Sequence, residues 1–318
     1  MTGHRPRTAV VTGGAGFIGT HLCTRLAADG VQVLCIDDLS TAREDAVTRL
    51  VAAGVTVARR SVTAPLHVDE PVDAVFHLAC PASPVDYRRL SLETLDAGAL
   101  GTRNALALAR RHGARFLLAS TSEVYGDPAV HPQTEDYRGD VDPVGPRSMY
   151  DEAKRFAEAY TVAYGRRHGT HAVIARIFNT YGPGMRADDG RMVPTFLAQA
   201  RAGAPPTVHG DGTQTRSLCF VDDTVAGLRA LIAHDDPGPV NIGNPEEVTV
   251  REVAERICRL LGRAPEPEFT PADPGDPRRR RPDITRARRL LGWRPTVDLD
   301  SGLHRTIAAE ARAAAPAV

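Results

Sequence analysis

Short apolar runs alternate with longer segments of helical periodicity through the first half of the chain. The runs are rich in Val, Ile, Leu and Ala, which is typical of buried strands, and they occupy residues 8–11, 31–36, 55–58, 74–78, 115–119 and 171–177. Segments with apolar residues three and four positions apart predict helices over residues 18–28, 90–111 and 149–168. This alternation predicts an α/β fold in which helices cover both faces of a doubly wound parallel sheet.

The pattern changes after about residue 180, where Gly and Pro become frequent and the periodic segments shorten. Helices are expected over residues 221–231 and 250–261, with Asp222 and Thr249 as their N-cap candidates. One more strand is expected over residues 240–242.

The length of 318 residues suits a nucleotide-binding domain that carries a smaller second lobe. We expect residues 1–180 to form a Rossmann-like nucleotide-binding domain, which later elements near residues 219–244 join. Residues 181–318 are expected to form mainly a smaller C-terminal substrate lobe.

Composition and charge narrow the classes of function. The chain has 39 Lys and Arg against 39 Asp and Glu, so its net charge does not favour a nucleic-acid or membrane partner. No apolar stretch reaches the roughly 20 residues that span a bilayer. The five cysteines include no C-x-x-C pair, and no His/Cys/Asp cluster has metal-ligand spacing. We expect a soluble, cytoplasmic protein with reduced thiols and no metal.

A glycine-rich turn, GGAGFIG at residues 13–19, stands between the first predicted strand and the first predicted helix. Its glycines allow a tight turn, close approach of the backbone to a pyrophosphate and close packing of helix on strand. The free N–H groups and the positive dipole end of the helix favour phosphate. The turn therefore predicts a dinucleotide site.

The second strand ends at Asp37 and Asp38, about 20 residues beyond the turn. A carboxylate there accepts hydrogen bonds from the adenosine ribose and repels a 2′-phosphate, which favours NAD over NADP. Arg43 is expected to face solvent. The predicted cofactor-binding residues are Gly13, Gly16, Phe17, Ile18, Gly19, Asp37, Leu78, Tyr150 and Lys154.

Two polar motifs are candidates for catalysis. Residues 120–123, Ser-Thr-Ser-Glu, follow the strand at 115–119 and are expected at the carboxyl edge of the sheet, where ligands bind in such folds. Tyr150 and Lys154 are four residues apart and lie on one face of a predicted helix. The ammonium group and a nicotinamide cation are expected to favour the tyrosinate, which makes Tyr150 a general base.

Together these motifs resemble those of the extended short-chain dehydrogenases/reductases and, among them, the UDP-glucuronate decarboxylases, or UDP-xylose synthases. The resemblance extends over nearly the whole chain. Its most specific stretches are LLASTSEVYGDPAVHPQTEDY, GPRSMYDEAKRFAEAY, ARIFNTYGPGMRADDGRMVPTF, DGTQTRS, VNIGNPEEVT and RRPDITRARRLLGW. It implies a UDP-sugar substrate and a homodimer formed through the helices at residues 90–111 and 149–168.

The resemblance implies a role for each matching residue of the two motifs. Tyr150 takes the proton of the sugar 4-hydroxyl, Lys154 holds the nicotinamide ribose and lowers the pKa of Tyr150, and Thr121 hydrogen-bonds the 4-oxygen. Glu123 matches a carboxylate that acts on the oxidised ring, with Ser122 beside it. Epimerases of this superfamily usually have no acidic residue at the position of Glu123, so this residue favours further chemistry.

Arginines are expected to bind the charged groups of the substrate. Within the arginine run at residues 278–281, Arg280 matches a residue that binds the sugar carboxylate. Asn179, Arg191 and Arg216 match positions that hold the sugar diphosphate and nucleotide, a task that suits the planar guanidinium fork.

The implied reaction is NAD-dependent decarboxylation of UDP-glucuronate to UDP-xylose. Oxidation at carbon 4 places the carboxylate β to a carbonyl, so carbon dioxide leaves and the charge moves to an enolate oxygen near Tyr150 and Thr121. Protonation at carbon 5 and return of hydride regenerate NAD. A nucleotide-sugar 4-epimerase or 4,6-dehydratase of the same superfamily is the alternative. A non-catalytic dinucleotide-binding module is disfavoured because Tyr150, Lys154, Thr121 and Glu123 are all retained.

Three positions depart from the family pattern. Ser61 replaces an aspartate at the adenine, Gly98 replaces a helical asparagine under the active site, and Cys80 replaces a serine beneath the cofactor. We expect Ser61 and Cys80 to loosen NAD binding, so that part of the UDP-4-keto-pentose intermediate is released.

Overall fold

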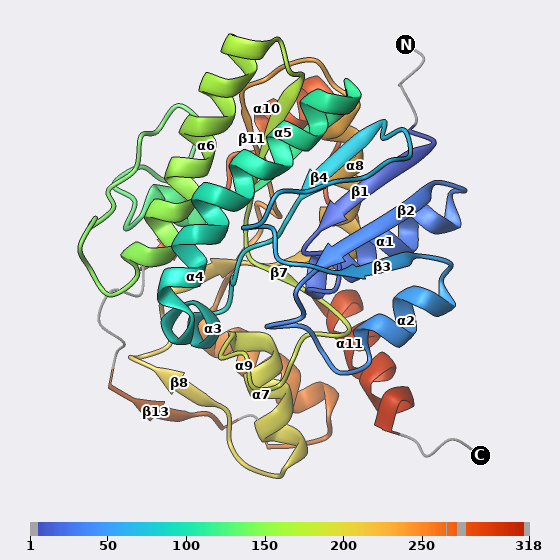
Figure 1. Cartoon of the computed structure of the whole chain (residues 1–318). Helices are drawn as coiled ribbons and strands as arrows, with labels where there is room; N and C mark the ends of the chain where they lie inside the picture. The colour runs from blue at the N-terminus through green and yellow to red at the C-terminus, as the bar shows by residue number, and fades with distance from the viewer. Residues whose placement is uncertain (1–5, 265, 272–277, 315–318) are drawn as a thin grey trace.

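A parallel sheet forms the centre of the molecule (Figure 1). The computed structural model describes residues 6–264, 266–271 and 278–314, and within them seven strands pair in the order β11-β6-β5-β4-β1-β2-β3. The strands are β1 (Thr8–Thr12), β2 (Gln32–Asp37), β3 (Thr56–Arg59), β4 (Ala74–His77), β5 (Arg115–Thr121), β6 (Ala172–Ile177) and β11 (Pro239–Ile242). The predicted strands and the doubly wound topology are confirmed, with the strand order reversing between β1 and β4.

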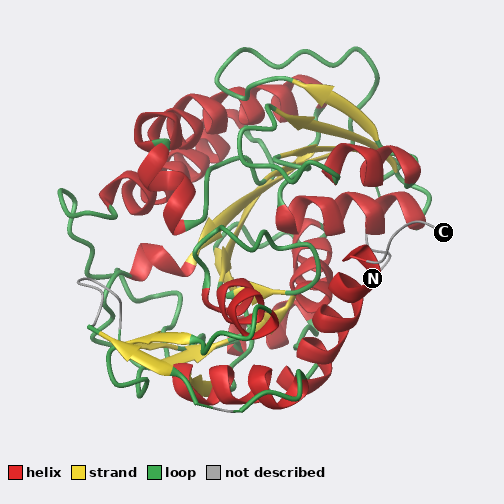
Figure 2. Ribbon diagram, turned by 90° about the horizontal axis from the view of Figure 1, so that it is seen from below, coloured by secondary structure: helices red, strands yellow, loops and turns green. Residues whose placement is uncertain are grey.

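Alternate residues of the strands supply two separate cores, one on each face of the sheet (Figures 1 and 2). Val11 of β1 belongs to the core that contains α1, α2, α8 and α10, whereas Val10 belongs to the core that contains α5 and α6. These helices are α1 (Phe17–Ala28), α2 (Ala46–Ala52), α5 (Thr102–His112), α6 (Ser148–His168), α8 (Val221–Ile232) and α10 (Thr285–Leu291). The period of two along each strand therefore explains why both faces are apolar.

The predicted helix over residues 90–111 is interrupted. It consists of α4 (Ser91–Asp96), a π-helical turn (Ala97–Gly101) and α5. The turn lies where Gly98 meets α6, because a Cβ atom on Gly98 would be 2.7 Å from Ala153 Cβ and 2.8 Å from Ala153 O. Glycine thus allows the two helices to approach closely.

Smaller strand groups and further helices complete the chain. The groups pair β8 (Thr207–His209) with β13 (Glu268–Thr270), β7 (Thr180–Tyr181) with β10 (Cys219–Phe220), and β9 (Thr215–Ser217) with β12 (Glu247–Thr249) and β14 (Arg279–Arg280). The remaining helices are α3 (Pro84–Arg89), the 3₁₀ turn Ser122–Tyr125, α7 (Met192–Arg201), α9 (Val250–Leu260) and α11 (Leu299–Ala314). None of the helices in the described residues has both the length and the apolar character needed to cross a membrane.

One of the two predicted N-caps is correct. Thr249 forms a capping box with Glu252 at the start of α9. Asp222 is not a cap, because α8 begins at Val221 and Phe220 precedes it. The carboxylate beside it, Asp223, accepts hydrogen bonds from the backbone that follows α10.

Candidate active site

A cavity of about 730 Å³ lies at the carboxyl edge of the sheet, between the sheet and the segments that follow β6. All the residues predicted to bind cofactor or substrate, or to act in catalysis, line this cavity. Residues from both halves of the chain therefore face one space, at the sheet edge where doubly wound folds bind ligands.

The glycine turn forms one wall of the cavity and fits a pyrophosphate. Gly13 has a φ of 70°, and a Cβ atom there would lie 2.6 Å from Ala79 N. A Cβ atom on Gly19 would lie 2.1 Å from Gly13 O. The N-cap of α1 is Gly16, so no side chain caps the helix, and its first turn contains no acidic residue. The N–H groups beside Phe17 are thus left for an anion.

Asp37 fixes the shape of this wall at the end of β2. Its carboxylate accepts hydrogen bonds from Ala15 N at 3.0 Å and Leu39 N at 2.8 Å. Burial raises the pKa of Asp37, and these two N–H groups act in the opposite direction. Leu78 and Asp38 also face the cavity.

The sequence predicts that Arg43 faces solvent, but in the structure its side chain also faces the cavity. It lines the cavity, pairs with Asp45 at 2.8 Å and lies 3.5 Å from Met185 O. A guanidinium already paired with a carboxylate is a poor partner for a 2′-phosphate, so its position does not contradict the preference for NAD.

Tyr150 and Lys154 lie one turn apart on α6, and both are buried. Lys154 Nζ donates to Ala119 O at 2.8 Å and lies 5.9 Å from the centroid of the Tyr150 ring. Burial raises the pKa of Tyr150, and a hydrogen bond with Thr121 lowers it only in part. Desolvation is therefore the larger of these two effects. The lowering of this pKa by Lys154 together with a nicotinamide cation stays a prediction.

Glu123 is held between two arginines in the 3₁₀ turn that follows β5. Arg280 binds Oε1 and Arg147 binds Oε2. Burial raises the pKa of Glu123, but Arg280 and Arg147 outweigh this effect and hold the pKa below its usual range. Ser122, the neighbour of Glu123, is buried at the cavity wall. Glu123 is thus a largely buried anion in the cavity wall.

Arg147 is a site residue that the sequence reasoning missed. It directly precedes α6 and lies three positions before Tyr150, inside the GPRSMYDEAKRFAEAY stretch. Its guanidinium contacts Glu123 only because the 3₁₀ turn and the start of α6 meet in space. Its place in a family-specific stretch was the one available signal.

Tyr87, which the sequence reasoning missed, and Cys80 both lie close to Tyr150. The Tyr87 ring stacks on the Tyr150 ring with centroids 5.2 Å apart and planes 12° apart. Cys80 lies in the cavity wall, and burial raises the pKa of its thiol. Ser61 also lines the cavity, with its hydroxyl 2.9 Å from Thr63 Oγ1.

The three predicted substrate arginines enter the cavity from different elements of the second half. Arg191 precedes α7, Arg216 lies in β9 and Arg280 in β14. Arg216 is buried and donates to Thr215 O at 2.8 Å. Asn179 joins them in the cavity wall. Three guanidinium groups that line one cavity suit a substrate with a diphosphate and a carboxylate.

The fold, the glycine turn and the Tyr150–Lys154 pair are together the features of a nucleotide-binding enzyme of the short-chain dehydrogenase/reductase type. Residues 9–243 match the model of the NAD dependent epimerase/dehydratase family, to which the chain belongs. It is 50% identical over 296 residues to UDP-glucuronic acid decarboxylase 6 of Arabidopsis thaliana, covering 92% of this chain and 86% of that protein. Within the larger family, the chain is a member of the UDP-glucuronic acid decarboxylases.

Solved structures share the fold at lower identity. UDP-glucose 4-epimerase of Thermotoga maritima, solved with UDP-glucose, superposes with a TM-score of 0.86 at 27% identity, over 96% of this chain and 99% of that chain. A mutant UDP-glucuronic acid 4-epimerase of Bacillus cereus, in complex with UDP-4-deoxy-4-fluoro-glucuronic acid and NAD, gives 0.84 at 26% identity, with the same coverage.

Proposed function

We propose that the protein catalyses the NAD-dependent decarboxylation of UDP-glucuronate to UDP-xylose through a UDP-4-keto-pentose. The observation that carries this function is the buried Glu123–Arg280 pair beside Tyr150 and Thr121. A carboxylate-binding arginine next to a Tyr–Lys pair suits a sugar acid, and the decarboxylase relatives are about twice as similar in sequence as the solved epimerases.

NAD is the cofactor, and this chain offers it a fitted site. The turn at residues 13–19 receives the pyrophosphate, Asp37 the adenosine ribose, and Lys154 the nicotinamide ribose, with Leu78 in the wall between them. When bound, NAD supplies a reversible hydride acceptor for carbon 4 of the sugar.

The side chains of the protein position the sugar and move its protons. Tyr150 takes the proton of the 4-hydroxyl, and its hydrogen bond with Thr121 supports a shared role of the two groups at the 4-oxygen. Arg280 binds the sugar carboxylate, which becomes β to the carbonyl at carbon 4 and leaves as carbon dioxide. Tyr150 and Thr121 then stabilise the enolate oxygen. Glu123, with Ser122 beside it, transfers a proton to carbon 5 after carbon dioxide has left.

The nucleotide end of the substrate is assigned to Asn179, Arg191 and Arg216. Their place in the cavity wall, on segments that follow β6, supports this assignment. In this proposal residues 1–180, with elements near 219–244, bind NAD, and residues 181–318 mainly bind the UDP-sugar.

Comparison of the parent protein with Tyr150→Phe and Arg280→Gln tests these roles. We expect Tyr150→Phe to retain NADH binding and lose at least about a hundredfold in carbon dioxide release, because no general base remains. Arg280→Gln should chiefly raise the KM for UDP-glucuronate. Carbon dioxide release that is unchanged in both variants would contradict the roles proposed for Tyr150 and Arg280. No carbon dioxide release from the parent protein would leave a binding module as the better account.

We also propose that the protein is a homodimer. Leu92 of α4 and Phe156 of α6 are 71% and 47% exposed, and α4 and α6 pack against each other. Large apolar side chains on adjacent helices favour an interface. Multi-angle light scattering should give twice the chain mass, and Phe156→Glu should halve it.

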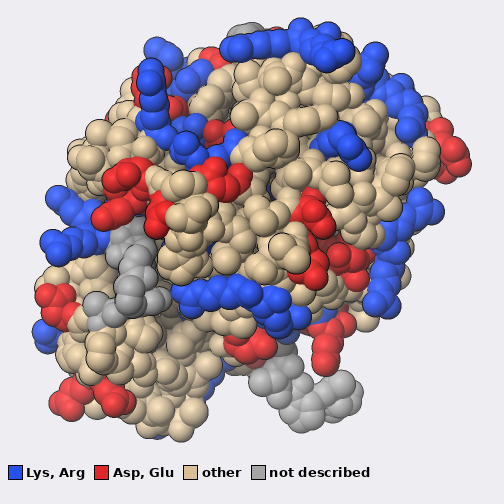
Figure 3. Space-filling view, turned by 60° about the vertical axis from the view of Figure 1, so that its left-hand side comes forward, with Lys and Arg blue, Asp and Glu red and all other residues tan. Residues whose placement is uncertain are grey.

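The free cysteines and the balance of charge bear on the location and the partners of the protein. All five cysteines are free thiols, which supports a reducing cytoplasmic location. We propose no nucleic-acid or membrane partner from the equal numbers of acidic and basic residues. On the face in Figure 3, acidic and basic side chains are interspersed.

A further inference from the structure

Residues 182–191, called the strap below, connect β7 to α7 and form one wall of the cavity. The first half of the strap contacts segments from the first half of the chain. Pro183 O lies 2.8 Å from His21 Nε2 of α1, and Met185 O accepts a hydrogen bond from Arg43 in the loop after β2. The strap is thus an ordered wall that other segments hold in place.

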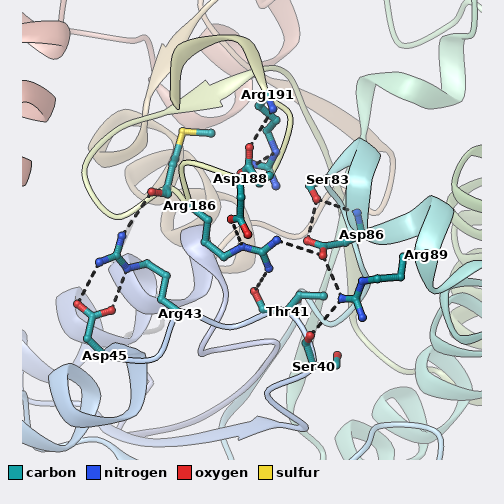
Figure 4. A network of polar contacts seen from close by, with 12 residues as sticks. Ser40, Thr41, Arg43, Asp45, Ser83, Asp86, Arg89, Arg186, Asp188 and Arg191 are labelled. Carbon is teal, nitrogen blue, oxygen red and sulfur yellow. Dashed lines mark hydrogen bonds and ion pairs between the residues drawn. The ribbon is translucent and has the colours of Figure 1, made fainter. Parts of the chain in front are cut away.

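Arg186 makes the contacts that cross the cavity (Figure 4). Its Nη1 donates to Thr41 O at 2.9 Å, and its Nη2 donates to Asp86 Oδ1 at 3.2 Å. Its Nε donates to Asp188 within the strap at 3.1 Å. One guanidinium therefore joins the strap to the loop after β2 and to helix α3. Thr41 and Asp86, the residues bound in these two segments, lie 100 residues or more from Arg186 along the chain.

The carboxylate of Asp86, which binds Arg186, is held in place and kept ionised by its surroundings. Asp86 is buried, and Ser83 Oγ donates to it at 2.7 Å. Burial raises the pKa of Asp86, but Ser83 and Arg186 outweigh it and hold the pKa below its usual range. The side chains of Arg186 and Asp86 are only 21% and 6% exposed, so the pair is more shielded than a surface salt bridge.

Both anchor points lie in the cavity wall beside residues of the predicted cofactor and catalytic sites. Thr41 follows Asp37, the residue assigned to the adenosine ribose. Asp86 is the neighbour of Tyr87, whose ring stacks on Tyr150. The guanidinium of Arg186 therefore joins three segments that line the cavity in which the dinucleotide is expected to lie.

We propose that Arg186 and Asp86 form a clasp that retains NAD(H) during turnover and so limits release of the UDP-4-keto-pentose. This inference rests on the proposed function. Each molecule of keto sugar released leaves one NADH that has not returned its hydride, so keto sugar and NADH accumulate in equal amounts. The clasp opposes the loosening expected from Ser61 and Cys80.

The test is Arg186→Gln, with Asp188→Asn as the matched control. Asp188 also binds Arg186, but it lies within the strap, is 81% exposed and makes no contact across the cavity. The rate of NADH dissociation is measured by stopped-flow fluorescence, and the melting temperature of each variant reports folding. We expect dissociation about tenfold faster in Arg186→Gln and unchanged in Asp188→Asn.

Asp86→Asn and the double variant complete a cycle. If the contact itself retains the cofactor, the second substitution adds little to the first. Equal dissociation rates in the parent, Arg186→Gln and Asp86→Asn would overturn the clasp even if UDP-xylose is formed. Faster dissociation with no product from UDP-glucuronate would support the clasp and contradict the proposed function, so the two failures are distinguishable.

Discussion

Glu123 and the proposed sugar-carboxylate site share one guanidinium, that of Arg280. A substrate carboxylate on Arg280 brings a second negative charge close to Glu123. Like charges raise each other's pKa. We infer that substrate binding increases the affinity of Glu123 for a proton, which suits a group that serves carbon 5.

Glu123→Gln keeps the shape of this side chain but cannot exchange a proton. We expect carbon dioxide release from UDP-glucuronate to fall by about a hundredfold, because proton transfer by a positioned side chain contributes about that much. Glu152→Gln is the control, since Glu152 lies on the same helix as Tyr150 and pairs with Arg155. A rate within twofold of the parent for Glu123→Gln would show that its carboxylate is not needed.

Asp151 makes stability depend on pH. Burial and the neighbouring Glu123 raise its pKa to about 7, and its Oδ1 atom is buried with no hydrogen-bond partner. Because its pKa is higher in the folded chain than in the unfolded chain, protonation of Asp151 stabilises the fold. This stabilisation is complete below the unfolded-state pKa of about 4 and is lost as the pH rises through the folded-state pKa of about 7.

Asp151→Asn removes that loss. We expect the free energy of unfolding of the variant, relative to that of the parent, to be larger at pH 8 than at pH 5 by about 2 kcal/mol. Urea denaturation at the two pH values measures it. An equal difference between the two proteins at both values would mean that Asp151 titrates as in the unfolded chain.

At the scale of elements, the π-helical turn shows how one glycine shapes the packing of two helices. The Cβ atom of Gly98→Ala would meet Ala153 on α6 at 2.7 Å, and backbone lies on the same side. We expect a loss of about 1–3 kcal/mol in the free energy of unfolding, as for other overpacked sites.

Gly165→Ala on α6 is the control for this substitution. Its Cβ atom would have one contact, at 3.2 Å with Thr170 O, so a smaller change in the melting temperature is expected. Equal losses in the two variants would indicate a general cost of substitution in these helices rather than close packing at Gly98.

Element types were predictable where the periodicity is strong. The apolar runs of β1 to β6 and the helical spacing of α6 appear in the sequence because each element is buried on defined faces. The π-helical turn was not predictable, since it depends on Ala153, which is distant along the chain. The cap at Asp222 failed because Asp and Asn fit both the N-cap and the first turn of a helix.

For the whole molecule, parallel pairing explains why the site could be located from sequence. Strand ends marked by Gly13, Asp37 and Thr121 meet at one sheet edge in any doubly wound fold. The second-lobe pairings, such as β8 with β13, join segments about 60 residues apart and leave no local signal. The contacts of Arg147 and Arg186 were missed for the same reason.

The central claim is tested most directly by incubating the purified protein with UDP-glucuronate and NAD and measuring the mass of the nucleotide sugars. We predict a product lighter by carbon dioxide, UDP-xylose, with UDP-4-keto-pentose as the minor species. A nucleotide sugar of unchanged mass would contradict the account, and its identification as UDP-galacturonate would assign the protein as a 4-epimerase instead.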